Sequence, residues 1–273
     1  MSDIVLSAGV RANLLQLQST AATITDTQHK LATGKRVGTA LDNPINYFTA
    51  QGLSNRANDL GNLLDSMSTA ISTIQAANNG LTSITKLVQS AQALASQAQQ
   101  TSDTTVRAGL ATQFTAIKAQ IDQLAGDSGF NGINLLNSTA STSLTVQLNE
   151  KSTSSVTVAA VDSTSTGLAI NNAANNWGAA ADITAASTDL TAALTTLRSQ
   201  AQAFGTQLST VQIRQDFTKA MVNTLQTGSD ALTLADSNEE GANLLALQTR
   251  QQLSTTALSL ASQASQAVLR LFQ

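Results

Sequence analysis

The sequence predicts a mainly α-helical protein, built as a long antiparallel helical coiled coil or bundle rod with a small β-hairpin insert. Three observations support this fold class. Apolar residues recur every three or four positions over most of the 273 residues, which is the spacing of helical seams. Within residues 130–175 the apolar residues alternate with polar ones, which is typical of strands. Aromatic residues make up only 3% of the chain, so aliphatic and small side chains must build its cores.

Residues 1–43 predict a terminal helix followed by a loop. Gly34 and Gly38 interrupt the helical spacing, and Asn43 before Pro44 is typical of an N-cap with proline in the first helical turn. The apolar seam of this first helix consists of Val10, Leu14, Leu17, Ala21, Ile24 and Leu31.

Residues 44–130 predict a long helix and then a shorter one. From Leu60 to Ala98, twelve seam positions follow one another without a missed step, which is a strong coiled-coil pattern. A further seam runs from Val106 to Leu124.

Residues 131–179 predict a short β or loop insert. The segment opens near the turn signal Asn131-Gly132, and Asn171–Gly178 is typical of a loop. Its alternating apolar positions, which fit a hairpin, are Leu144, Val146, Leu148, Val156 and Val158.

Residues 180–228 predict a further rod helix, and residues 229–273 predict the terminal helix. Gly228 is expected to separate them, and Glu239 and Glu240 suit the positive end of the last helix dipole. The seam of the last helix is Leu253, Ala257, Leu260, Ala264, Ala267 and Leu271. The helical rod domain is thus expected to comprise 44–130 and 180–228, with a core of Leu60, Leu63, Met67, Ile74, Leu81, Ile84, Val88, Ile117, Ile121, Leu197, Phe204, Leu208 and Val211.

The composition argues against several classes of function. Charged residues make up 11% of the chain and the net charge is −3, so no basic face for nucleic acid is expected. The chain has no cysteine for a thiolate metal site, and His29 is its only histidine. Gly34-Lys35-Arg36 lacks the surrounding residues of a phosphate loop. The sequence therefore predicts no enzyme, no catalytic, metal or cofactor site, and no nucleic-acid or membrane partner.

Three stretches of the chain resemble the bacterial flagellin family. Residues 31–42, which read Leu-Ala-Thr-Gly-Lys-Arg-Val-Gly-Thr-Ala-Leu-Asp, are similar to its N-terminal signature. Phe130-Asn131-Gly132 followed by Leu135-Leu136 is similar to the element after its third helix. Residues 247–271 are similar to its C-terminal helix, and the three stretches occur in the family's order.

The resemblance implies a short filament subunit that lacks the family's outermost domains. Such a subunit self-assembles into the bacterial flagellar filament, which is extracellular and serves motility. Segments 1–43 and 229–273 are then expected to pair and to form the inner filament core. The resemblance also implies type III export and a set of partners: copies of the chain itself, an export chaperone, the filament cap and hook-junction proteins. Residues 89–94 lack the arginines of receptor-activating flagellins, so Toll-like receptor activation is expected to be weak.

The terminal seams, which are the predicted subunit-packing residues, offer less apolar area for burial than the rod seam, because alanine contributes little. Burying a methylene stabilises by about 0.8 kcal/mol, whereas ordering one residue costs about 1–2 kcal/mol. We therefore hypothesise that roughly 1–40 and 235–273 are disordered in the monomer and become helical during assembly.

Two alternative functions stay open on the sequence. A hook–filament junction protein also resembles flagellin at both termini. A helical signalling or adaptor module is the second alternative, but such modules normally carry charged residues beside the seam, and this chain is poor in charge.

Overall fold

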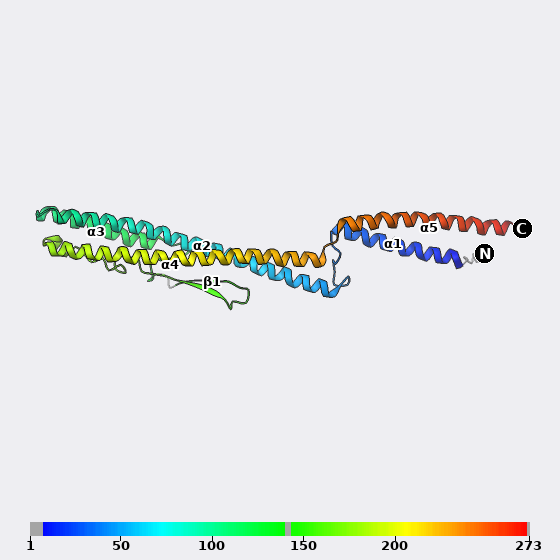
Figure 1. Cartoon of the computed structure of the whole chain (residues 1–273), viewed down its shortest axis with the longest axis horizontal. Helices are drawn as coiled ribbons and strands as arrows, with labels where there is room; N and C mark the ends of the chain where they lie inside the picture. The colour runs from blue at the N-terminus through cyan, green and yellow to red at the C-terminus, as the bar shows by residue number, and fades with distance from the viewer. Residues whose placement is uncertain (1–7, 140–142, 272–273) are drawn as a thin grey trace. The chain divides into compact units, whose positions relative to one another are not determined.

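The computed structural model describes residues 8–139 and 143–271, and within them the chain is mainly helical (Figure 1). The elements in chain order are α1 (Ala8–Thr33), α2 (Pro44–Gln99), α3 (Thr104–Asp127), β1 (Ser143–Gln147), β2 (Ser155–Ala159), the 3-10 turn η1 (Ala174–Trp177), α4 (Ala180–Thr233) and α5 (Ser237–Leu271). The predicted class, mainly α with a small antiparallel hairpin, is confirmed. The chain forms two compact units. The terminal unit joins the residues up to Asn55 with those from Thr224 onward, and the middle unit is Arg56–Asn223.

The terminal unit is organised around α1 and α5, which lie antiparallel along each other (Figure 1). The predicted pairing of the two terminal helices is therefore confirmed. On α1 the buried residues are Thr20, Ile24 and Thr27. The hydroxyl of Thr20 donates to the carbonyl of Gln16 at 2.8 Å, so its burial leaves no unsatisfied donor. Two of the three buried residues on this contact are threonines, which makes its apolar area small.

The loop between α1 and α2 is fastened by its backbone to the end of α4. The amides of Arg36 and Val37 donate to the carbonyl of Thr233 at 2.8 and 3.1 Å, and the amide of Ala235 donates to the carbonyl of Gly34 at 3.0 Å. Gly34 has a φ of 67°, a left-handed conformation that glycine adopts without steric penalty. The loop is therefore an ordered part of the terminal unit.

One predicted helix boundary is confirmed and one is wrong. α2 begins at Pro44, and the side-chain oxygen of Asn43 accepts a backbone amide of the first turn at 3.0 Å. By contrast, Gly228 does not interrupt the helix, because α4 continues to Thr233. Glycine inside a helix costs about 1 kcal/mol relative to alanine. A Cβ at this position would lie 3.4 Å from Cδ1 of Leu53, which is close to an ordinary van der Waals contact.

The middle unit has one continuous apolar core, to which α2, α3, α4 and the hairpin contribute. α3 and α4 both run antiparallel to α2 (Figure 1). In the hairpin, Leu144 lies opposite Val158 and Val146 lies opposite Val156. The side chains of Leu144, Val146 and Val158 are buried, so the alternating residues place one face of the hairpin in the core.

The turn after α3 has the conformation that the sequence predicts. Asn131 and Gly132 have positive φ values of 49° and 80°, which is the requirement of a type I′ turn. Phe130 and Ile133 on either side exchange two backbone hydrogen bonds of 2.8 and 3.0 Å. This tight turn redirects the chain from the end of α3 toward the hairpin.

Asn134 closes the C-terminal end of α3. Its amide nitrogen donates to the carbonyls of Ala125 and Gly126, both at 2.8 Å, and its Oδ1 accepts the amide of Leu136 at 2.8 Å. These carbonyls belong to the last turn of the helix, where no backbone partner is available within the helix. A buried side chain thus satisfies the helix end inside the core.

Gly80 is a point where the packing of α2 tolerates no side chain. A Cβ there would lie 2.3 Å from Oγ of Ser128 and 2.6 Å from Cδ1 of Leu136. We expect Gly80→Ala to lower the free energy of unfolding by about 1–3 kcal/mol through overpacking, despite the better helix propensity of alanine. Urea unfolding followed by circular dichroism measures this change.

The matched control is Gly61→Ala, in the same helix and the same unit. A Cβ at Gly61 meets no atom within 4 Å, so this variant is expected to be stabilised by about 0.5–1 kcal/mol. Equal changes in the free energy of unfolding for the two variants would show that the neighbours of Gly80 move aside without destabilising the unit.

Candidate functional site

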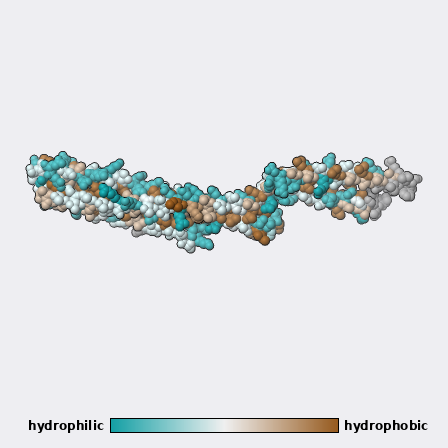
Figure 2. Space-filling model, viewed as in Figure 1, coloured by the Kyte–Doolittle hydropathy of each residue, from teal (hydrophilic) through white to brown (hydrophobic). Residues whose placement is uncertain are grey.

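A row of apolar side chains along α5 is exposed in the single chain. Leu245, Leu253 and Leu260 are 67%, 65% and 61% exposed. Their spacings of eight and seven residues are close to two helical turns, so the three leucines share one face. Ala257, Ala264 and Ala267 are exposed as well, and we call these six residues the α5 stripe. In Figure 2 exposed apolar residues appear as brown patches on a surface that is otherwise mostly white and teal.

A second row on α5 is half-buried. It consists of Leu244, Leu247, Gln251, Ser254, Leu258 and Ala261, at spacings of three and four. Because α5 packs against α1, this half-buried row marks the face toward α1. The predicted seam of the last helix, which includes Leu253 and Leu260, is therefore not the face of α5 that packs against α1. Leu271, the last residue of α5, has a side chain outside the described part.

The predicted seam of α1 lies partly inside the contact with α5. Ile24 is buried, and the structure leaves Leu14 and Leu31 about two-fifths exposed. The remaining seam residues, all half-buried, are Val10, Leu17 and Ala21. Leu245, which extends the α5 stripe, was not among the predicted residues, although its spacing from Leu253 is the signal that identifies it.

The predicted rod-core residues lie in the interior of the middle unit to different degrees. Buried side chains are those of Leu60, Met67, Ile74, Leu81, Ile84, Val88, Ile121, Leu197, Phe204 and Val211. Half-buried side chains are those of Leu63, Ile117 and Leu208. Sequence reasoning missed Trp177, the only tryptophan of the chain, which is fully buried although it lies within the predicted loop Asn171–Gly178.

The loop from Gly38 to Asp42 combines a hydrogen-bonded backbone with an exposed apolar side chain. Oδ2 of Asp42 accepts hydrogen bonds from the amides of Gly38 and Thr39 at 3.0 and 2.8 Å, and from the hydroxyl of Thr39 at 3.1 Å. Leu41, directly before it, is 95% exposed. The backbone hydrogen bonds from Thr39 and Gly38 hold the pKa of the Asp42 carboxyl below its usual value.

This lowered pKa predicts how the loop responds to acid. The folded pKa lies below the unfolded one, so the hydrogen bonds contribute fully above about pH 4 and are lost as pH falls through the folded value. We expect the amide proton shift of Thr39 to be constant down to about pH 4 and to change below it. In Asp42→Asn, where the acceptor remains but cannot titrate, that change should be absent. A change centred near neutral pH in both proteins would contradict the assignment.

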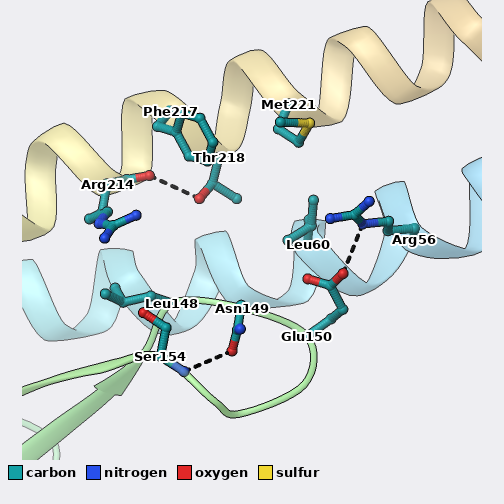
Figure 3. Close-up of a pocket in the computed structure, with 10 residues that line it drawn as sticks. All are labelled: Arg56, Leu60, Leu148, Asn149, Glu150, Ser154, Arg214, Phe217, Thr218 and Met221. Carbon is teal, nitrogen blue, oxygen red and sulfur yellow. Dashed lines mark hydrogen bonds and ion pairs between the residues drawn. The ribbon is translucent and has the colours of Figure 1, made fainter.

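In the middle unit, a cavity of about 210 Å³ lies where the hairpin turn meets α2 and α4 (Figure 3). Nε of Arg56 pairs with Oε1 of Glu150 at 2.8 Å. The turn is itself held by Asn149, whose Oδ1 accepts the amide of Ser154 at 3.1 Å. Figure 3 shows Arg56 and Arg214 on opposite sides of this cavity. The ion pair ties the tip of the hairpin to α2.

The described residues contain no grouping of three histidine, aspartate or glutamate side chains suited to a metal ion. None of the described helices is both long and apolar enough to cross a membrane.

Comparison with protein families gives two matches that together span most of the chain. Residues 10–141 match the bacterial flagellin N-terminal helical region. Residues 180–272 match the bacterial flagellin C-terminal helical region. The segment between the two matches contains both strands of the hairpin and η1.

Individual relatives match over their whole length. Flagellin FljM of Caulobacter vibrioides is 32% identical over 277 residues, covering 100% of this chain and 99% of the relative. Flagellin FljO of the same organism is 31% identical over 279 residues with the same coverage. A flagellin of Brucella melitensis is 27% identical over 290 residues and covers both chains completely.

Proposed function

The chain belongs to the bacterial flagellin family, and we propose that it assembles through the exposed faces of its two terminal helices. As a flagellin it is a structural subunit of the extracellular flagellar filament and not an enzyme. Full-length similarity to named flagellins favours a filament subunit over a hook–filament junction protein or a helical adaptor.

The α5 stripe is the observation that supports this proposal most directly. Covering one exposed leucine stabilises by about 1.5–3 kcal/mol, and the stripe carries Leu245, Leu253 and Leu260. The alanines between them allow another helix to approach closely. We propose that neighbouring copies cover this stripe, while α1 covers the half-buried row beside it. The proposed subunit-packing residues are Val10, Leu14, Leu17, Ala21, Ile24, Leu31, Leu253, Ala257, Leu260, Ala264, Ala267 and Leu271.

The same proposal assigns each segment of the chain to one part of the subunit. Segments 1–43 and 229–273 are assigned to the inner filament core, segments 44–130 and 180–228 to the helical rod domain, and 131–179 to the short insert. The rod domain is expected to fold through the core residues described above. Export by the type III route, escort by a chaperone, and contacts with the filament cap and hook-junction proteins are further proposals, which rest on family membership.

The terminal helices are proposed to gain most of their stability from assembly. The buried apolar residues in the described part of the terminal unit are Ile24, Val37, Ala50 and Leu225. The middle unit has a far larger core, from Met67 to Val211. Because apolar burial has to offset the conformational entropy of ordering, the terminal unit is the weaker one.

Amide hydrogen exchange on monomer and filament tests this proposal. In the monomer, amides of α1 and α5 are expected to exchange rapidly, while those of the middle unit are protected. In filaments formed by salting out and verified by electron microscopy, both ends are expected to become protected. Strong protection of both ends already in the monomer would count against the proposal, with the middle unit serving as the internal control.

A further inference from the structure

We propose that the Leu41 loop of one copy binds to the Phe217 surface of a second copy in the filament. The Leu41 loop is residues 38–42. The Phe217 surface is Ile213, Arg214 and Phe217 together with the cavity beside them. This inference rests on the assembly of copies described above and adds a specific pair of contact surfaces to it.

The Leu41 loop presents its apolar side chain on a backbone that is held by hydrogen bonds. Leu41 is 95% exposed, so the described part of its own chain covers almost none of it. The backbone around it is held by the three hydrogen bonds to Asp42, by the bond from the Asp42 amide to the carbonyl of Thr39 at 3.2 Å, and by Pro44 shortly after. Hydrogen bonds that hold a loop in its bound conformation reduce the conformational entropy lost on binding, which favours its use as a contact.

The Phe217 surface presents apolar side chains around a recess. Ile213 and Phe217 are 66% and 55% exposed, and they share a face of α4 because they are four residues apart. Leu60, Leu148 and Met221 are among the apolar residues that line the cavity beside them (Figure 3). An apolar side chain that enters this recess covers the exposed part of Phe217 and the partly exposed Met221.

Each surface carries one charged group that is available to pair with the other, Arg214 on the Phe217 surface and Asp42 on the Leu41 loop. Among the described residues no carboxylate pairs with Arg214, whereas Arg56 across the cavity is paired with Glu150. In the Leu41 loop, all three hydrogen bonds to the Asp42 carboxylate go to Oδ2, so Oδ1 has no partner in the described part of the chain. When Leu41 enters the recess, the neighbouring Asp42 offers this oxygen to Arg214. Guanidinium and carboxylate groups form strong charge-assisted hydrogen bonds.

The proposed contact joins two different surfaces. Every copy carries one Leu41 loop and one Phe217 surface, so each copy binds two others. Such head-to-tail contacts generate rings or open helical filaments and do not end at a dimer. The pairing therefore agrees with a protein that forms filaments.

Disulfide formation in filaments tests the pairing, and the absence of cysteine from the chain makes the test clean. The variant Leu41→Cys with Phe217→Cys is polymerised, oxidised and examined by non-reducing gel electrophoresis. Because a disulfide forms only between closely placed residues, we expect a ladder of covalent dimers, trimers and higher oligomers. Each single variant should stay monomeric. The matched control combines Leu41→Cys with Val106→Cys, another exposed position, and should give no ladder.

Two results would contradict the inference in different ways. Filaments of the double variant without covalent products, or with as many as the Val106 control gives, would overturn the pairing and leave the filament function intact. A wild-type chain that forms no filaments would overturn both. If only the double variant fails to polymerise, a mixture of both single variants and wild-type chains is polymerised and oxidised instead. Covalent dimers containing one of each variant then support the pairing, and their absence refutes it.

Discussion

Leu260→Asp is expected to abolish filament formation while leaving the middle unit folded. In the single chain Leu260 is 61% exposed on the α5 stripe, so aspartate there is solvated and does little harm to the monomer. In the filament the proposed neighbour covers this position. The substitution then loses the burial of a leucine and places an unpaired carboxylate in an apolar contact. We expect a loss of about 3 kcal/mol or more per subunit, which raises the critical concentration by at least about a hundredfold.

Sedimentation of polymer after salting out measures the critical concentration, and circular dichroism of the monomer verifies that the helices persist. The matched control is Leu260→Met, which preserves volume and apolarity and should polymerise nearly as the wild type does. Normal filaments from Leu260→Asp would show that the α5 stripe faces solvent in the polymer. A collapse of monomer helicity would instead show that Leu260 supports the fold of the chain itself.

Trp177→Ala is expected to lower the free energy of unfolding of the middle unit by about 3–5 kcal/mol. Trp177 is fully buried, and its ring centroid lies 5.1 Å from that of Phe114 on α3. It sits in a left-handed turn, with φ of 46°, 51° and 58° at Asn175, Asn176 and Trp177. Such a conformation costs about 1–2 kcal/mol per non-glycine residue. The packing of the indole offsets this strain, and alanine keeps the strained backbone without the packing.

Two controls separate packing from other roles of Trp177. Nε1 of the indole is buried and has no hydrogen-bond partner among the described residues, so Trp177→Phe removes an unsatisfied donor while keeping a ring against Phe114. We expect this variant to lose clearly less stability than Trp177→Ala. Phe130→Ala, at a position that is 41% exposed, should change stability only slightly. Urea unfolding followed by far-UV circular dichroism compares the three variants. Equal losses of stability in Trp177→Ala and Phe130→Ala would contradict the claim that the buried indole stabilises the middle unit.

The helices and the hairpin could be predicted from the sequence because their signals lie in residues that are close together along the chain. A seam such as Leu60 to Ala98 encodes its helix in the spacing of neighbours, and Asn43-Pro44 encodes the start of α2 in adjacent residues. The same holds for the Asn131-Gly132 turn and the alternation of β1 and β2. Family resemblance also rests on short ordered motifs. Fold class and the role as a filament subunit were thus accessible from the sequence alone.

Tertiary structure decided which apolar face meets which partner. α5 carries two apolar stripes, and spacing cannot tell whether Leu258 or Leu260 faces α1, since both rows satisfy the helical period. Spacing also does not show that α4 continues through Gly228 to Thr233, or that Trp177 is buried against Phe114. Periodicity is a property of one segment, whereas burial is a property of two segments brought together. For this reason the sequence identified the helices, and only the packed chain identified the surfaces that remain for other copies.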